Sequence, residues 1–166
     1  MEIVIFDIDG TIADANHRKH FIEGKPKNWN AFLSACEHDD PIPQTIEILR
    51  MLHDSGKIIV FFTGRSDKHR QETVRWLRRY VFPDVSWDIN NYLYMREDGD
   101  FRCDAVVKQD LLDHLKDEYK IDQPPYFENE EIFTIWGCFD DRKVVTEMWN
   151  RNKIFCFDVA QGKGDF

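Results

Sequence analysis

The feature of this sequence that most constrains its fold is the alternation of short apolar segments with amphipathic ones. Apolar runs typical of buried strands occur at 3–6, 57–65, 92–95, 131–141 and 153–159, and helical periodicity occurs at 43–56, 66–82, 104–119 and 142–152. Strands that are apolar along their length and alternate with helices are typical of a parallel sheet covered on both faces. We therefore predict an α/β fold with one sheet between two helical layers.

The apolar spacing within the helical segments predicts which side chains face the sheet. Ser66 is a candidate N-cap, and Gly56 suits the end of a helix. The inward positions predicted from helical spacing are Ile46, Leu49, Leu52, Val74, Leu77, Val81, Val106, Leu111, Leu112 and Leu115. Trp136 and Trp149 are assigned to the core, where most tryptophans are largely buried.

Composition restricts the class of protein. The chain has 166 residues, 42% of them hydrophobic, which suits a single domain over 1–166 and neither a disordered nor a membrane-spanning chain. Its formal net charge of −9 repels phosphate backbones at long range. No leader-like segment opens the sequence, and the four cysteines form no CxxC pair. We therefore expect a cytoplasmic protein with reduced thiols and no zinc site.

Polar and charged residues follow the predicted strands at the points where those strands end. Because ligands bind beyond the carboxyl ends of parallel strands, we expect these residues to converge. They are Asp7 and Asp9 after the first strand, Thr63, Gly64 and Arg65 after the second, Asp140 and Asp141 after the fourth, and Lys108 in the helix before it. A single DxD or DD pair is often a solvated turn, and it is the joint pattern that predicts a site.

These residue types together are suited to phosphoryl chemistry. Clustered carboxylates coexist at low cost only around a cation, and an all-oxygen ligand set favours Mg²⁺. Lys108, Arg65 and the Thr63 hydroxyl supply donors for a phosphoryl group. Asp7 would attack phosphorus to form an aspartyl-phosphate. Asp9 would act as general acid and then as general base.

The four groups resemble the motifs of the haloacid dehalogenase superfamily of phosphohydrolases, as DIDGT, FFTGR, Lys108 and FDDR. A narrower resemblance is to the 3′-phosphatase domains of the bacteriophage polynucleotide kinase–phosphatase type. It is carried by VIFDIDGTIADANHR, FFTGR, DAVVK, FDDRKVVTEMW and VAQGKGDF. It implies a haloacid dehalogenase fold, a three-layer Rossmann-like sheet with a small helical cap at about 13–43 after the first strand. The implied activity is Mg²⁺-dependent removal of 3′-phosphates from nucleic-acid ends.

The resemblance also implies roles for single residues. Asp7 would be the nucleophile and Asp9 the general acid–base. The phosphate-binding residues would be Thr63, Lys108, Arg18 and Arg65, and Gly64 would permit a close backbone approach. The implied Mg²⁺ ligands are the Asp7 carboxylate, the Asp9 backbone carbonyl, Asp140 and Asp141, the last either as a ligand or behind one.

The cap segment bears on the substrate. It carries Arg18, Lys19, Lys25 and Lys27 against the single acid Glu23, and Trp29 lies close by in sequence. One interpretation is a landing surface for a nucleotide or strand end, with Trp29 stacking on a base. The other is an ordinary solvated helix with a buried tryptophan, and the sequence leaves both open.

Two function hypotheses remain at this point. The resemblance and the basic cap favour a polynucleotide 3′-phosphatase of the end-repair type, and the charge of −9 favours a phosphatase of mononucleotides or other small metabolites. No GxxxxGK[ST] motif occurs, so we expect no P-loop kinase module in this chain. A signalling receiver domain is disfavoured, because here the DxD pair comes first and the adjacent acids come late. The acidic segment 122–131 is predicted to be a surface loop.

Overall fold

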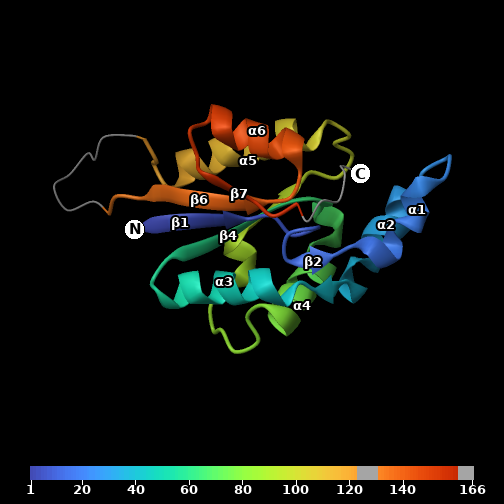
Figure 1. The fold of residues 1–166 in the computed structure, drawn as a ribbon, viewed down its shortest axis with the longest axis horizontal. Helices are drawn as coiled ribbons and strands as arrows, with labels where there is room; N and C mark the ends of the chain where they lie inside the picture. Colours follow the sequence, from blue (N-terminus) through green and yellow to red (C-terminus); the bar gives the residue numbers. More distant parts are fainter. Residues whose placement is uncertain (123–130, 161–166) are drawn as a thin grey trace.

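The computed structural model describes residues 1–122 and 131–160, and within them a five-stranded sheet forms the centre of the fold (Figure 1). Its strand order is β5-β4-β1-β6-β7, and every neighbouring pair is parallel. In that order the strands are Leu93–Arg96, Ile58–Ser66, Glu2–Phe6, Thr134–Asp140 and Cys156–Asp158. The predicted α/β fold class with a parallel sheet is confirmed. Most of segment 122–131 lies outside the described residues.

Helices cover both faces of this sheet, as Figure 1 shows. On one face lie α3 (Pro43–Asp54) and α4 (Arg70–Tyr80). On the other lie α5 (Asp104–Glu118) and α6 (Lys143–Arg151). Two short 3-10 helices, η3 (Asp67–His69) and η4 (Ile89–Tyr92), precede α4 and β5. None of the described helices is long and apolar enough to cross a membrane.

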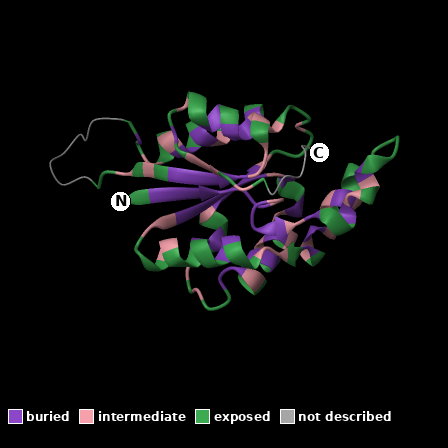
Figure 2. Cartoon of the chain, viewed as in Figure 1, coloured by how far each residue is buried: buried purple, intermediate pink, exposed green. Residues whose placement is uncertain are grey.

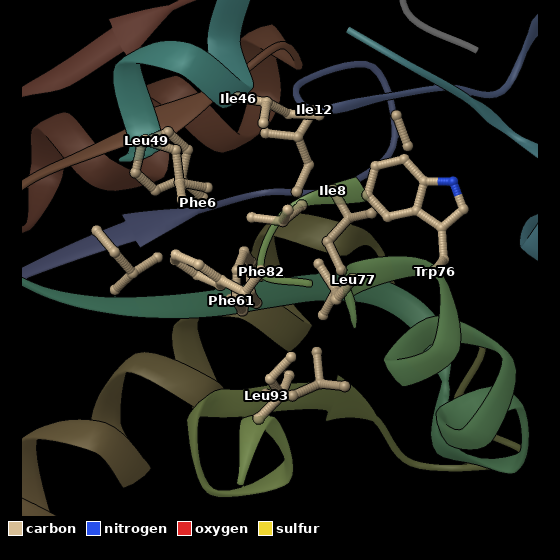
Figure 3. Close-up of a cluster of buried hydrophobic side chains, with 14 of the residues drawn as sticks. Phe6, Ile8, Ile12, Ile46, Leu49, Phe61, Trp76, Leu77, Phe82 and Leu93 are labelled. Atoms are coloured by element: carbon tan, nitrogen blue, oxygen red, sulfur yellow. The ribbon is translucent and has the colours of Figure 1, made fainter. Parts of the chain in front are cut away.

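Strand β1 contributes to both cores by the alternation of its side chains. Val4 and Phe6 point into the cluster shared with α3 and α4, part of which is drawn in Figure 3. Ile3 and Ile5 point into the cluster shared with α5 and α6. The central strand β1 is therefore buried from Ile3 to Phe6 (Figure 2), and each fully buried aliphatic or aromatic side chain contributes roughly 1.5–3 kcal/mol. This anchors β1 at the centre of the fold, so the residues that follow it have a fixed position.

The cap extends beyond the end of the sheet opposite to the N-terminus (Figure 1). It consists of η1 (Asn16–Arg18), α1 (His20–Glu23), α2 (Trp29–Ser34) and η2 (Ala35–His38). The base of the cap is closed by a two-stranded antiparallel pair, β2 (Ala13–Asp14) with β3 (Asp40–Pro41). The short helices match the sequence-based prediction, whereas this strand pair was not predicted.

The predicted position of Val106 is wrong, because this side chain is 44% exposed on α5. The buried face of α5 instead runs through Ala105, Lys108, Leu112 and Leu115, at helical spacing. The charged residue Lys108 thus lies on the inward face. Apolar spacing alone leaves out Lys108, although it is a predicted site residue, and therefore places Val106 on the inward face.

Two further predictions need correction. Ser66 caps η3 rather than α4, since it pairs with Arg96 and so extends β4 before the helix begins. Trp136 is partly exposed and stacks on Phe157, with ring centroids 5.6 Å apart, outside both main clusters. Trp149 is buried as predicted.

Candidate active site

The carboxyl end of the central strand β1 leads directly to Asp7. The Asp7 backbone N–H donates to the carbonyl of Phe139 on β6, at 3.0 Å. Its carboxylate accepts from Lys108 Nζ at 2.7 Å and from the Thr11 hydroxyl at 3.1 Å. Lys108 Nζ also donates to Asp140 Oδ2 at 2.7 Å. The first, third and fourth predicted groups therefore meet within hydrogen-bond distance at one edge of the sheet.

Asp7, Asp140 and Asp141 form an acidic cluster whose ligand atoms lie within 4.8 Å of one another. Burial, and the charges of Asp140 and Asp141, raise the pKa of Asp7 well above its usual value despite the nearby Lys108. Burial and the charge of Asp140 also raise the pKa of Asp141, to about 6. The cluster therefore carries more negative than positive charge. Asp140 and Asp7 raise the pKa of Lys108, although its burial acts in the opposite direction.

The environment of Asp141 is compatible with a cation at this cluster. Its Oδ1 atom is buried and lacks a hydrogen-bond partner among the described residues. A buried carboxylate oxygen without a donor costs free energy that a bound cation would recover. The oxygen-only donor set matches what Mg²⁺ takes in proteins. The residues present therefore fit the ion predicted from the sequence.

Gly10 allows Asp141 to come this close. Its φ is +89°, and a Cβ atom built there would lie 2.0 Å from Asp141 Oδ2. Both the backbone conformation and the space require glycine at this position. The glycine of the first motif therefore provides room for the acid of the fourth.

Asp9 lies in a second, separate network of charges. Its carboxylate accepts from Arg18 Nη2 at 2.6 Å and from Arg65 Nη2 at 2.5 Å. Both arginines also donate to Asp39, at 2.7 and 2.8 Å. Although burial acts in the opposite direction, the two guanidinium groups lower the pKa of Asp9 well below its ordinary value. Two carboxylates thus face two arginines, and Asp9, with its side chain 25% exposed, is the member open to the site.

The structure places Arg18 away from the cap surface to which the sequence pattern assigned it. Arg18 and Arg65 are both fully buried, and the Arg18 guanidinium packs 4.1 Å from the centre of the Phe32 ring. The basic character of the exposed cap therefore comes from its lysines. Asp39 was not predicted as a site residue, and its signal is weak, because the adjacent Asp40 looks identical in sequence yet is exposed.

Thr63 and Gly64 directly precede Arg65 on β4. Thr63 is buried, and its hydroxyl accepts from the Arg65 backbone N–H at 3.2 Å. Gly64 lies against Asp104, because a Cβ atom added there would be 2.8 Å from Asp104 Oδ1. Asp104 is in turn held by ion pairs to Arg96 and Arg142. Asp104 lies one turn before Lys108, so these contacts fix the start of α5 and the lysine that it carries.

A cleft of about 630 Å³ leads to this edge of the sheet. Asp7, Asp9 and Gly64 line its inner end. Other lining residues come from the cap, including Lys27 and Trp29, and from the segment 96–104 between β5 and α5. Trp29 is 46% exposed, so it is not the buried tryptophan of the second interpretation.

Comparisons with known proteins agree with this geometry. The family model described as the polynucleotide kinase PNKP phosphatase domain matches residues 1–123. The "Putative bifunctional polynucleotide kinase/RNA ligase" of Autographa californica nuclear polyhedrosis virus is 28% identical over 153 residues, which is 91% of this chain and 18% of the viral protein.

Solved structures give a matching result. A chain of the Pnkp1/Rnl/Hen1 RNA repair complex aligns with a TM-score of 0.69 and 26% identity, covering 99% of this chain and 43% of that one. The class C acid phosphatase of Bacillus anthracis shares the fold, with a TM-score of 0.63 at 14% identity and coverage of 99% and 68%. The chain thus spans less than half the length of the viral protein and of the repair-complex chain.

The family match covers well over half of the chain, and the matched residues include the first three motifs. The family match and the sheet-edge position of these motifs lead to one conclusion, and the solved structures agree with the fold. This chain belongs to the family of polynucleotide kinase PNKP phosphatase domains, and it is a phosphatase of the haloacid dehalogenase type.

Proposed function

We propose that this chain is a Mg²⁺-dependent phosphomonoester hydrolase that removes 3′-phosphates from nucleic-acid ends through an aspartyl-phosphate on Asp7. The observation that carries the proposal is the position of Asp7. It lies at the inner end of the cleft, follows the central strand, and contacts Lys108 and Thr11. A carboxylate oriented by two donors at the end of a cleft is well placed to attack an incoming phosphorus atom.

In the first step an Asp7 oxygen forms a bond to phosphorus, and the bond from phosphorus to the ester oxygen breaks. The electron pair of that bond goes to the leaving oxygen, which takes a proton from Asp9. In the second step Asp9 accepts a proton from water as the water attacks phosphorus, and Asp7 is released as a carboxylate with inorganic phosphate. Lys108 and the Thr63 hydroxyl would balance charge on the transferred group.

The pKa of Asp9 bears on the order of these events. The two arginines keep Asp9 ionised in the structure, which suits the second step but not the first. Arg18 and Arg65 are fully buried and do not line the cleft, so a contact with the substrate phosphate would require their guanidinium groups to turn away from Asp9. That movement would remove hydrogen bonds from Asp9 and allow it to take a proton. The implied phosphate contacts of the two arginines and the acid role of Asp9 are compatible in this way.

Asp7, Asp140 and Asp141, with the backbone carbonyl of Asp9, would hold the Mg²⁺ ion. When bound, the ion offsets the charge of these carboxylates and of the incoming phosphate. The support on this chain is the three-carboxylate cluster and the unpartnered Asp141 oxygen.

The nucleic-acid part of the proposal is supported by the family and by the cleft. The matched family and the viral relative are named as polynucleotide kinases, and one solved relative belongs to an RNA repair complex. The cap wall of the cleft offers lysine and tryptophan side chains. The alternative, a phosphatase of mononucleotides, is favoured by the net charge of −9.

The test is phosphate release in the presence of Mg²⁺ from three matched substrates: a 3′-phosphorylated oligonucleotide, the same strand with a 5′-phosphate, and a free 3′-mononucleotide. We expect the 3′-phosphorylated strand to have the highest kcat/KM. Asp7→Asn should abolish release, because an amide is a poor nucleophile. A preference for the mononucleotide would show that the substrate is a small metabolite and not a nucleic-acid strand. Substantial activity of Asp7→Asn would refute the covalent step.

A further inference from the structure

Two exposed aromatic side chains from different segments of the chain line the cleft at the active site. Phe101 comes from the segment between β5 and α5 and is 90% exposed, more than any other large hydrophobic residue that the structure describes. Trp29 comes from α2 of the cap. Asp7 and Asp9 line the same cleft. A single exposed apolar residue needs no explanation, but two exposed rings from different segments that line one catalytic cleft do.

Hydrogen bonds to the backbone of the segment that carries Phe101 hold this side chain outward. Arg96 Nη1 donates to the carbonyl of Asp100 at 3.0 Å and to the carbonyl of Arg102 at 2.7 Å. These carbonyls lie on either side of Phe101, so one guanidinium fixes the backbone around the ring. An anchored loop keeps Phe101 in solvent instead of letting it fold back onto the protein, which favours a role in contacting a ligand.

Trp29 is held in a comparable way. The Asn28 side chain caps α2 by accepting from the Ala31 backbone N–H at 3.0 Å. The Trp29 ring packs edge-on against Phe32, with centroids 5.8 Å apart, and Lys27 Nζ lies 5.3 Å from its centroid. A tryptophan with a neighbouring cation, fixed at its edge and open to the cleft, is typical of a surface that stacks on a nucleobase.

We infer that Trp29 and Phe101 together form an aromatic clamp that stacks on the terminal bases of an unpaired nucleic-acid strand and directs its 3′ end to Asp7. This inference rests on the proposed function and names the substrate class of the same site. In a duplex the terminal bases are paired and stacked within the helix, so they would have to be unpaired before both rings could grip them.

The charge of the protein makes such a clamp useful. With a net charge of −9, the chain gains little from attraction to a phosphate backbone. Two carboxylates of the segment 96–104 are paired with arginines, since Asp100 pairs with Arg102 and Asp104 with Arg142. Stacking does not depend on net charge, and it tolerates any sequence because every base has a flat face.

The test compares kcat/KM of Phe101→Ala and Trp29→Ala with wild type on three substrates. They are a 3′-phosphorylated single strand, the same strand lacking its terminal base, and p-nitrophenyl phosphate. Each variant should lose about fivefold to 150-fold on the intact strand, mostly in KM, and little on the aryl phosphate. On the strand that lacks its terminal base, the kcat/KM of wild type should be lower by a similar factor than on the intact strand. At least one variant should show little further decrease in kcat/KM on that strand. Trp29→Phe should restore most of the loss, and Phe155→Ala is the control, an exposed phenylalanine outside the cleft.

The outcomes separate the clamp from the function on which it rests. Wild type that releases no phosphate from the strand refutes both. Wild type that is active on the strand, with variants that lose nothing or lose equally on the aryl phosphate, refutes the clamp and leaves the phosphatase proposal standing. A blunt duplex cleaved as well as the single strand also refutes the clamp. Thermal unfolding of each variant shows that a loss on the strand alone is not a loss of fold.

Discussion

Asp39→Asn should destabilise the protein strongly although Asp39 lies outside the cleft lining. The Asp39 carboxylate is fully buried and accepts from Arg18 and Arg65, and from His17 Nε2 at 2.8 Å. Replacing the carboxylate by an amide leaves Asp9 as the single carboxylate for two buried guanidinium groups, and it turns an N–H₂ group toward their donors. Breaking a buried ion network in this way costs about 3–5 kcal/mol. For a chain of this size that corresponds to a Tm lower by about 10 °C.

The assay is thermal unfolding monitored by circular dichroism, with Asp40→Asn as the matched control. Asp40 is the next residue, has the same side chain and is exposed, so its substitution should leave Tm nearly unchanged. Turnover of an aryl phosphate below Tm should also fall for Asp39→Asn, because both arginines that orient Asp9 lose a partner. A Tm for Asp39→Asn equal to that of Asp40→Asn would show that the ion network contributes far less to the free energy of unfolding than its burial indicates.

Three other predictions concern the acidic cluster and α5. Gly10→Ala should lower phosphatase activity and weaken the effect of Mg²⁺ on Tm, because its Cβ would displace Asp141. The control is Gly56→Ala, which adds a Cβ at a similar φ of +90° with nothing within 4 Å and should affect stability alone. Equal losses of activity in the two variants would contradict this prediction. In EDTA, Tm should rise as pH is lowered from 7 toward 5. The raised pKa of Asp141, about 6, means that the folded state binds more protons in this range than the unfolded state, so stability falls as pH rises. Mg²⁺ should therefore raise Tm more at pH 7 than at pH 5, and an equal rise at both would count against binding at this cluster. Val106→Lys should change the free energy of unfolding by less than about 0.5 kcal/mol, as measured by urea titration, because Val106 is exposed; a larger loss would place it in the core after all.

The sequence predicts the sheet and the first layer of the site well because both depend on short-range patterns. Apolar runs that end in charge mark β1 and β6, and parallel strands bring Asp7 and Asp140 to one edge. The helix pattern misplaces Val106, because apolar periodicity leaves out Lys108, whose charge pairs with Asp7 directly after β1 and with Asp140 on β6. Periodicity does not register an ion pair between residues distant in the chain.

The second layer of the site is beyond such patterns for the same reason. Asp39 is distinguished from Asp40 only by contacts with Arg18 and Arg65, which lie 21 and 26 positions away. Phe101 is a single aromatic residue between charged neighbours, and nothing in its local sequence separates it from an ordinary loop residue. That it lines the same cleft as Trp29 follows from the fold alone.

The closed base of the cap has a consequence for how domains of this kind diversify. Arg18 and Asp39 bond to each other near the two ends of the insertion, and the pairing of Ala13 with Pro41 seals it below them. At its base, the intervening segment is thus attached to the catalytic body by the Arg18–Asp39 ion pair and the pairing of β2 with β3. We expect a chimera that exchanges 19–38 for a foreign segment, while keeping a ring in the place of Phe32, to hydrolyse aryl phosphates at a similar rate and to change in its choice of strand. Loss of aryl phosphate turnover in such a chimera would show that cap and chemistry cannot evolve separately.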